Sequence, residues 1–124
     1  MIAADTSSLV AFFGGDKGKD VEMIDAAMKA ATLHLPPVVI TELLSDRNSS
    51  VIIGVDLVDA PMLSILPGYW QRAGATRRLL LEKGLRAKIP DTLIAQSCID
   101  HDVPLIARDP DFRHFAKHCG LKLA

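Results

Sequence analysis

The chain has 124 residues, 49% of them hydrophobic, and its 15 acidic and 14 basic side chains leave a formal charge of −1. This length predicts one domain, residues 1–124, which buries roughly two-thirds of its unfolded surface and so has a real core. The near-neutral charge supplies no global field for a nucleic acid, and no apolar run approaches the roughly 18 residues that a membrane span requires.

Short apolar runs alternate with helical patterns along the whole chain. In chain order they predict a strand at 2–4, helices at 9–13 and 20–31, a strand at 33–35, helices at 38–46 and 49–59, a strand at 62–66, helices at 69–83 and 92–101, a strand at 103–107, a helix at 111–119 and a strand at 121–123. This alternation is typical of a parallel sheet with right-handed crossovers and helices on both faces.

Local signals fix some of these ends and faces. The hydroxyls of residues 6–8 are predicted to cap the first helix, so Asp5 need not serve as its cap. The helix 20–31 is expected to bury Val21, Ile24, Ala27, Met28 and Ala31, and the helix 38–46 to bury Val39, Ile40, Leu43 and Leu44.

Four acidic residues occupy positions where chemistry is often done. Asp5 and Asp109 each follow a strand, and ligands of open parallel sheets bind outside the carboxyl ends of the strands. Asp91 begins a helix, and Glu42 interrupts an apolar helix, where a buried, unpaired charge would be costly. Taken singly, each also has a plain structural interpretation: a helix-start residue for the aspartates, or a solvent-facing side chain for Glu42.

Gathered in one pocket, these carboxylates would repel one another and would need a divalent cation. Hard oxygen ligands favour Mg²⁺ or Mn²⁺ over zinc. Such an ion lowers the pKa of a bound water and offsets charge on a phosphate, and two ions about 4 Å apart would perform both tasks in phosphodiester hydrolysis.

Basic residues concentrate between positions 72 and 88, where a single acid, Glu82, opposes them. This local excess could contact phosphates, although a solvated helix face explains it equally well. The candidates for contact with RNA are Arg72, Arg77 and Arg78, together with Arg108, which precedes Asp109.

The segments MIAADTSSLVAFF, VITELLSD, PDTLIAQSCIDHDVPLIARDPDF and GLKL, in this order and spacing, resemble PIN-domain proteins, and most closely VapC-like toxin ribonucleases. The resemblance covers nearly the whole chain. It implies a three-layer α/β/α fold with a mainly parallel sheet of about five strands, in the order 3-2-1-4-5. That order places Asp5 beside Asp109.

The resemblance also implies roles for individual residues. The family's catalytic acids fall on Asp5, Glu42, Asp91 and Asp109, and the metal ligands among them are Asp5, Asp91 and Asp109. Asp111 is an additional candidate, since only Pro110 separates it from Asp109, and the hydroxyl of Thr6 or Ser7 would help to orient a ligand. Ala107 departs from the family pattern, in which a hydroxyl residue often precedes the arginine.

In function, the resemblance implies a Mg²⁺- or Mn²⁺-dependent ribonuclease that acts as the toxin of a toxin–antitoxin pair. It further implies a homodimer, an RNA substrate and a cognate antitoxin that blocks the acidic pocket. The alternative is a PIN fold that binds RNA or a partner protein without cutting.

Other families fit the sequence less well. A haloacid dehalogenase would need a second aspartate where Ser7 stands, and a receiver domain would need a phosphoacceptor aspartate where the third strand reaches Leu66. His114, His118 and Cys119 resemble half a zinc site without a third ligand. Cys98 and Cys119 are expected to be buried, reduced thiols, and the acid at position 5 argues against a signal peptide, so we expect a soluble, cytoplasmic protein.

Overall fold

The computed structural model describes residues 1–48 and 60–124, so the helix predicted at 49–59 lies outside the described residues. None of the described helices is long and apolar enough to cross a membrane. In chain order the elements are β1 (Ile2–Ala4), α1 (Thr6–Phe13), α2 (Lys19–Lys29), β2 (Leu33–His34), α3 (Pro37–Leu44), α5 (Tyr69–Glu82), α6 (Ile89–His101), β3 (Leu105–Ile106) and α7 (Phe112–Cys119).

The sheet is parallel, and its strand order is the one expected. β1 lies in the centre and pairs with β2 on one side and β3 on the other. Beyond them, Met62 forms a parallel bridge with Leu35, and Leu123 forms one with Leu105. The order 3-2-1-4-5 is therefore confirmed. The two predicted outer strands, however, are reduced to single bridges, as short edges often are.

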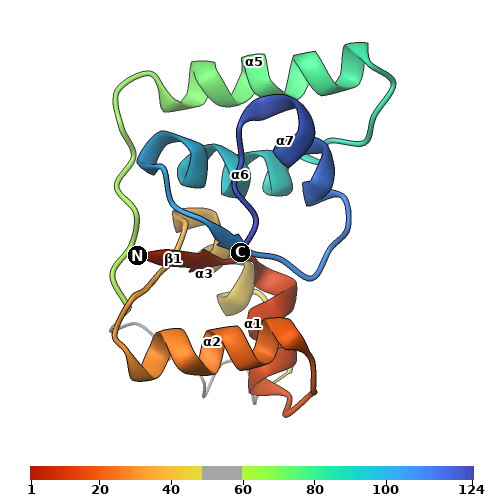
Figure 1. Ribbon diagram of the computed structural model, residues 1–124. Helices are drawn as coiled ribbons and strands as arrows, with labels where there is room; N and C mark the ends of the chain where they lie inside the picture. The colour runs from red at the N-terminus through yellow and green to blue at the C-terminus, as the bar shows by residue number, and fades with distance from the viewer. Residues whose placement is uncertain (49–59) are drawn as a thin grey trace.

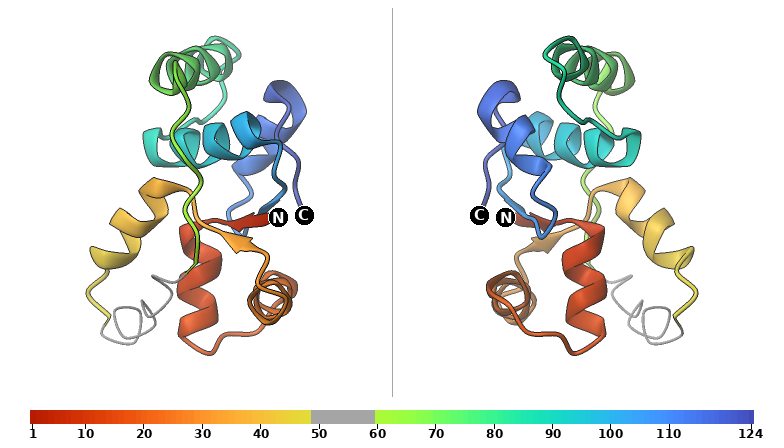
Figure 2. Two further views of the ribbon diagram at one scale, coloured as in Figure 1. Left: turned by 90° about the vertical axis from the view of Figure 1, so that its left-hand side faces the viewer. Right: turned by 90° about the vertical axis from the view of Figure 1, so that its right-hand side faces the viewer.

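Helices cover both faces of this sheet, which confirms the three-layer architecture. α1 and α2 lie on one side, and α5, α6 and α7 lie on the other (Figure 1). α3 packs against both α1 and α6 and lies beyond one end of the sheet (Figure 2). The strands are enclosed as a result: Ala3, Ala4, Leu105 and Ile106 are fully buried.

The predicted inward faces are correct at their centres and wrong at their margins. Ile24 and Ala27 of α2 are buried, as are Val39 and Leu43 of α3, whereas Val21 and Ile40 are partly buried. Met28, Ala31 and Leu44 are exposed, Leu44 by 54%. Successive helical residues point about 100° apart. A residue next to a buried one therefore faces away from the core unless another element covers it, and the ends of helices are the least covered.

An ion pair fastens α5 to α6. Arg72 donates from Nε and Nη2 to the two carboxylate oxygens of Asp100, at 3.0 and 2.6 Å, and from Nη1 to the Pro67 carbonyl at 2.7 Å. The carboxylate is only 5% exposed, and the guanidinium of Arg72 holds the pKa of Asp100 below its usual range. Arg72, predicted as a possible RNA contact, thus has a structural partner.

Replacing Arg72 by Gln is expected to lower the melting temperature by roughly 5 °C, because Asp100 would remain buried without its charged partner. The matched control is Arg78→Gln, which breaks a pair between two exposed side chains, Arg78 and Glu82, and should leave the melting temperature almost unchanged. Equal shifts in the two variants would contradict a structural role for Arg72.

A candidate metal centre at the carboxyl ends of the strands

Asp5 follows β1 and is the N-cap of α1. Its Oδ1 accepts the backbone N–H of Ser8 at 2.8 Å, and its Oδ2 accepts the Ser7 hydroxyl at 3.0 Å and the Arg108 N–H at 3.2 Å. The interpretation that Asp5 need not cap the helix is therefore wrong: α1 begins at Thr6, because an aspartate at this position satisfies its first free N–H groups. The Asp5 side chain is 1% exposed and held from two segments of chain.

Asp91 lies in the first turn of α6, because this helix begins at Ile89, three residues before the predicted start at 92, with Pro90 in its first turn. Proline is well tolerated there, since its missing N–H would have no partner in the helix. Among the described residues no hydrogen-bond donor to the Asp91 carboxylate is found. Its side chain therefore remains available to a ligand.

Asp109 and Asp111 lie in the turn between β3 and α7. Asp109 Oδ1 accepts the backbone N–H of Asp111 at 2.9 Å, so Asp109 shapes the turn that carries both residues. Asp111 is the N-cap residue of α7 without a capping side-chain bond, and its Oδ2 lies 3.7 Å from Arg86 Nε. Both carboxylates are partly buried.

Glu42 projects from α3 toward α1. Its Oε1 accepts the hydroxyl of Thr6 at 2.6 Å, a contact across 36 positions of sequence. No hydrogen bond to Oε2 is found in the described part of the chain. Thr6, one of the two predicted orienting hydroxyls, thus fixes Glu42, while the other, Ser7, contacts Asp5.

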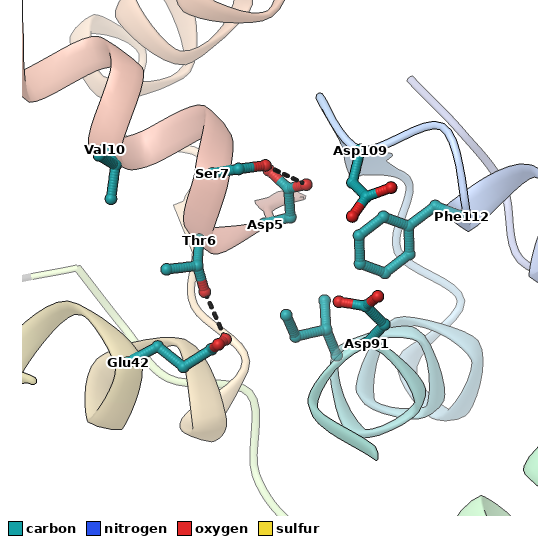
Figure 3. A pocket seen from close by; sticks show the side chains of 9 residues that line it. Asp5, Thr6, Ser7, Val10, Glu42, Asp91, Asp109 and Phe112 are labelled. Atoms are coloured by element: carbon teal, nitrogen blue, oxygen red, sulfur yellow. Dashed lines mark hydrogen bonds between the residues drawn. The ribbon is translucent and has the colours of Figure 1, made fainter. Parts of the chain in front are cut away.

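All of these side chains except that of Asp111 line one pocket of about 380 Å³ (Figure 3). All four predicted catalytic acids line it, with the two predicted hydroxyl residues. Val10, Ile94 and Phe112 form the apolar part of its wall, and no sequence pattern distinguished them from ordinary core residues. Convergence at this place follows from the parallel sheet, because the carboxyl ends of β1 and β3 meet at one edge.

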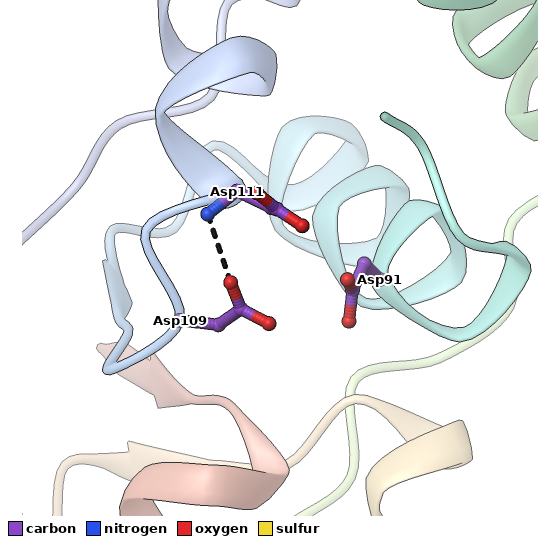
Figure 4. Close-up of side chains that lie close together, drawn as sticks. All are labelled: Asp91, Asp109 and Asp111. Carbon is purple, nitrogen blue, oxygen red and sulfur yellow. Dashed lines mark hydrogen bonds between the residues drawn. The ribbon is translucent and has the colours of Figure 1, made fainter. Parts of the chain in front are cut away.

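Three of the acids lie closest together. Asp91, Asp109 and Asp111 each offer an oxygen within 4.8 Å of the others (Figure 4). Over residues 1–48 and 60–124 this is the one group of acidic, histidine or cysteine side chains with such spacing. Asp5, predicted as a ligand, is not a member of this group, while Asp111, the additional candidate, is. His114, His118 and Cys119 are not among the described side chains that have this spacing.

The surroundings of Asp91 disfavour its ionised form. Burial raises its pKa from 3.8 to about 6, and the negative charges of Asp109, Glu42 and Asp111 add to this effect, while Lys88 opposes it. Two causes of this kind, desolvation and like charge, both disfavour the ionised form. A cation in the cluster would relieve the second of them.

The predicted basic contacts lie outside the pocket. Arg108 follows β3, and its guanidinium donates to Asp20 at 2.8 and 3.1 Å and to the Lys17 carbonyl at 3.3 Å. These bonds hold the end of β3 in place. At the same strand end, the backbone N–H of Arg108 donates to Asp5. Arg77 and Arg78 lie on α5, which packs on α6. Whether any of them contacts RNA stays a prediction.

The two cysteines differ from each other. Cys98 is buried, and burial raises the pKa of its thiol to about 12, so it is inert as expected. Cys119 is only partly buried, which corrects the expectation that both thiols lie in the core. Both are free thiols.

Comparisons with known proteins agree with this architecture. A family model described as PIN domain matches residues 2–118. The chain is similar in fold to the crystal structure of VapBC2 from Rickettsia felis bound to a DNA fragment from their promoter, with a TM-score of 0.74 and 19% identity over 100% of this chain and 98% of the other. No curated protein matches the chain.

Replacing Asp91 by Asn is expected to change the pH dependence of stability in metal-free protein. Because the pKa of Asp91 is raised on folding from 3.8 to about 6, the folded state binds its proton more tightly, and stability falls as the pH rises between these values. The Asn side chain does not ionise, so the stability of the variant does not fall over this pH range. In thermal unfolding with chelator, it should match the wild type near pH 4 and exceed it at pH 7; parallel curves would contradict the raised pKa.

Proposed function

We propose that this chain, which belongs to the PIN domain family, is a divalent-metal-dependent ribonuclease that hydrolyses phosphodiester bonds of RNA. The observation that carries the proposal is the convergence of Asp5, Glu42, Asp91 and Asp109, drawn from four different segments, on one pocket. A fold that served only as a scaffold would not need to bring four acids together against their mutual repulsion.

The donors suit Mg²⁺ or Mn²⁺. Carboxylate oxygens are the ligands these ions prefer. Asp91 and Asp109 belong both to the ligand set implied by the sequence and to the close cluster in the structure, and we assign them as the central ligands. The third would be Asp111, which lies in the cluster, or Asp5, whose oxygens also serve the α1 cap. When bound, the cation supplies Lewis acidity, lowering the pKa of water and offsetting charge on the phosphate.

The chain's own residues would divide the remaining work. Glu42 is held through Oε1 by Thr6, which leaves Oε2 directed to accept a proton from water. Asp5 orients the strand end that carries Asp109, because it accepts the N–H of Arg108. Phe112 and Ile94 restrict the entry of solvent from one side of the pocket.

The biological role follows from the resemblance to VapC-like toxins. We propose that the protein is the toxin of a toxin–antitoxin pair, that it forms a homodimer, and that a cognate antitoxin covers the acidic pocket. Its substrate, cellular RNA, would place the activity in the cytoplasm. The alternative is a PIN fold that binds RNA or a partner without cutting, and retention of all four acids argues against it.

Replacing Asp91 by Asn is expected to reduce RNA cleavage by about 100-fold or more, since the variant loses a central ligand. Asp91 is preferred to Asp5 for this test because it accepts no hydrogen bond in the described structure, so loss of folding does not accompany loss of charge. Cleavage of a labelled RNA is measured with Mg²⁺ or Mn²⁺ and with chelator.

Chelator should abolish cleavage by the wild type as fully as the substitution does. The matched control is Glu82→Gln, which removes an exposed acid on α5 and should cleave normally. Undiminished cleavage by purified Asp91→Asn protein would assign the activity to a contaminant and favour the non-catalytic alternative.

Millimolar Mn²⁺ or Mg²⁺ is expected to raise the melting temperature of chelator-treated protein by several degrees, because a ligand selective for the folded state stabilises it by about 2.7 kcal/mol at 100 times its Kd. Asp91→Asn should lose this shift, while Glu82→Gln should keep it. A melting temperature that does not change over the whole metal titration would argue against the metal centre.

A further inference from the structure

A second depression, here called the α5–α6 groove, lies between these two helices. It has a volume of about 170 Å³ and is lined by Trp70, Ala73, Gly74 and Arg77 of α5 and by Ile89, Thr92 and Leu93 at the start of α6. On each helix these positions recur at spacings of three and four, so they form one continuous face. The small residues at 73 and 74 form its floor.

An aromatic side chain that is not packed into the protein core lies in the groove. Trp70 is 60% exposed, with its indole edge-to-face against the ring of Tyr69 at 4.9 Å, and Ile89 beside it is 56% exposed. A Cβ added at Gly74 would meet nothing within 4 Å, so the space over the floor is open. An exposed tryptophan beside an open slot is a surface on which a flat, apolar group can stack.

Cations border the groove. Arg77 lines it and uses Nε to donate to the Ala87 carbonyl at 2.7 Å, and no ion pair to its guanidinium is found among the described residues. Lys88, the residue before α6, is exposed; it forms no ion pair in the described ranges, although its charge acts on Asp91. Among the other bases of this region, Arg72, Arg78 and Arg86 form ion pairs with acids. Positive charge beside an aromatic slot suits a nucleotide, which has a flat base and an anionic phosphate.

The groove and the acidic pocket lie on two sides of the same helical turns. Ile89, Thr92 and Leu93 face the groove, while Asp91 and Ile94, interleaved with them, face the pocket. The two sites are thus separated by about one helix diameter, ~10 Å. A single strand that crosses the beginning of α6, past Lys88, would reach both.

We propose that the α5–α6 groove is a subsite for an unpaired base of a single-stranded RNA substrate, which stacks on Trp70 while Arg77 and Lys88 contact the adjoining phosphates. The subsite rests on the proposed nuclease function, which it deepens by naming single-stranded RNA as the substrate class. The strand would enter at Trp70 and pass over the start of α6 into the acidic pocket.

A second copy of the chain fits this groove less well. In a two-fold dimer the same patch meets itself, so Arg77 and Lys88 would be brought toward their own counterparts, and no acid lines the groove to offset them. Phosphates supply the missing negative charge. Self-association through the groove is therefore kept as an outcome of the test that would contradict the proposal.

The test uses the fluorescence of Trp70, which is the chain's one tryptophan and therefore reports on this site alone. Asp91→Asn protein with Mg²⁺ is titrated with a short single-stranded RNA of mixed sequence, which this variant should leave intact. We expect saturable quenching of the emission, and none with the same sequence in a fully base-paired duplex. Absent quenching, or emission that shifts with protein concentration before RNA is added, would overturn the subsite.

A second readout is the separate effect of substitutions in the groove on KM and on kcat. With the four acids intact, Trp70→Ala and Gly74→Leu should raise KM for single-stranded RNA about ten-fold and leave kcat nearly unchanged, since stacking of one base is lost or its slot is filled. Trp70→Phe should retain most of the affinity. The matched control is Ala75→Leu, an exposed position on the same helix outside the groove, which should not change KM.

The two proposals fail in different ways. If the wild type cleaves RNA and Gly74→Leu does so with unchanged KM, the subsite is wrong and the nuclease stands. If no preparation cleaves RNA but Trp70 is quenched by single strands, the nuclease is wrong and the groove binds RNA in a protein that does not cut.

Discussion

Mutual repulsion of carboxylates at the carboxyl ends of β1 and β3 is the constraint on which this structure depends. Negative charges brought within a few ångströms in a partly buried site disfavour one another's ionised forms. Burial first, and then the neighbouring negative charges, raise the pKa of Asp91 to about 6. A fold that holds such groups together must be stable for other reasons. Here those reasons are the enclosed strands of the sheet and the helices on both of its faces.

Specific hydrogen bonds hold the acidic side chains of the site in place. Asp5 is fixed from two directions, by the first turn of α1 and by the N–H of Arg108. The Arg108 guanidinium reaches back to Asp20 at the start of α2, which ties the end of β3 to the opposite layer of helices. Thr6 then positions Glu42 across the pocket. One short segment, residues 5–7, therefore contacts both the end of β3 and α3.

The resemblance to PIN-domain proteins implied the strand order, and with it the meeting of Asp5 and Asp109, which both follow strands. The sequence could not predict features set by contacts distant in sequence. Arg72 was a candidate for RNA contact because its partner Asp100, 28 positions away, is not apparent from the sequence. The cap at Asp5 was missed because the hydroxyls after it are equally good caps. The grouping of Asp111, rather than Asp5, with Asp91 and Asp109 depends on the turn that Asp109 makes with the Asp111 N–H.

The most direct measurement of the central claim, that these carboxylates together hold a divalent ion, is anomalous diffraction from crystals soaked in Mn²⁺. The account predicts a strong anomalous peak at coordinating distance from oxygens of both Asp91 and Asp109, and none in crystals of a variant lacking the Asp91 carboxylate. A map with Mn²⁺ bound elsewhere on the protein, or with no peak between these two side chains at saturating metal, would contradict it.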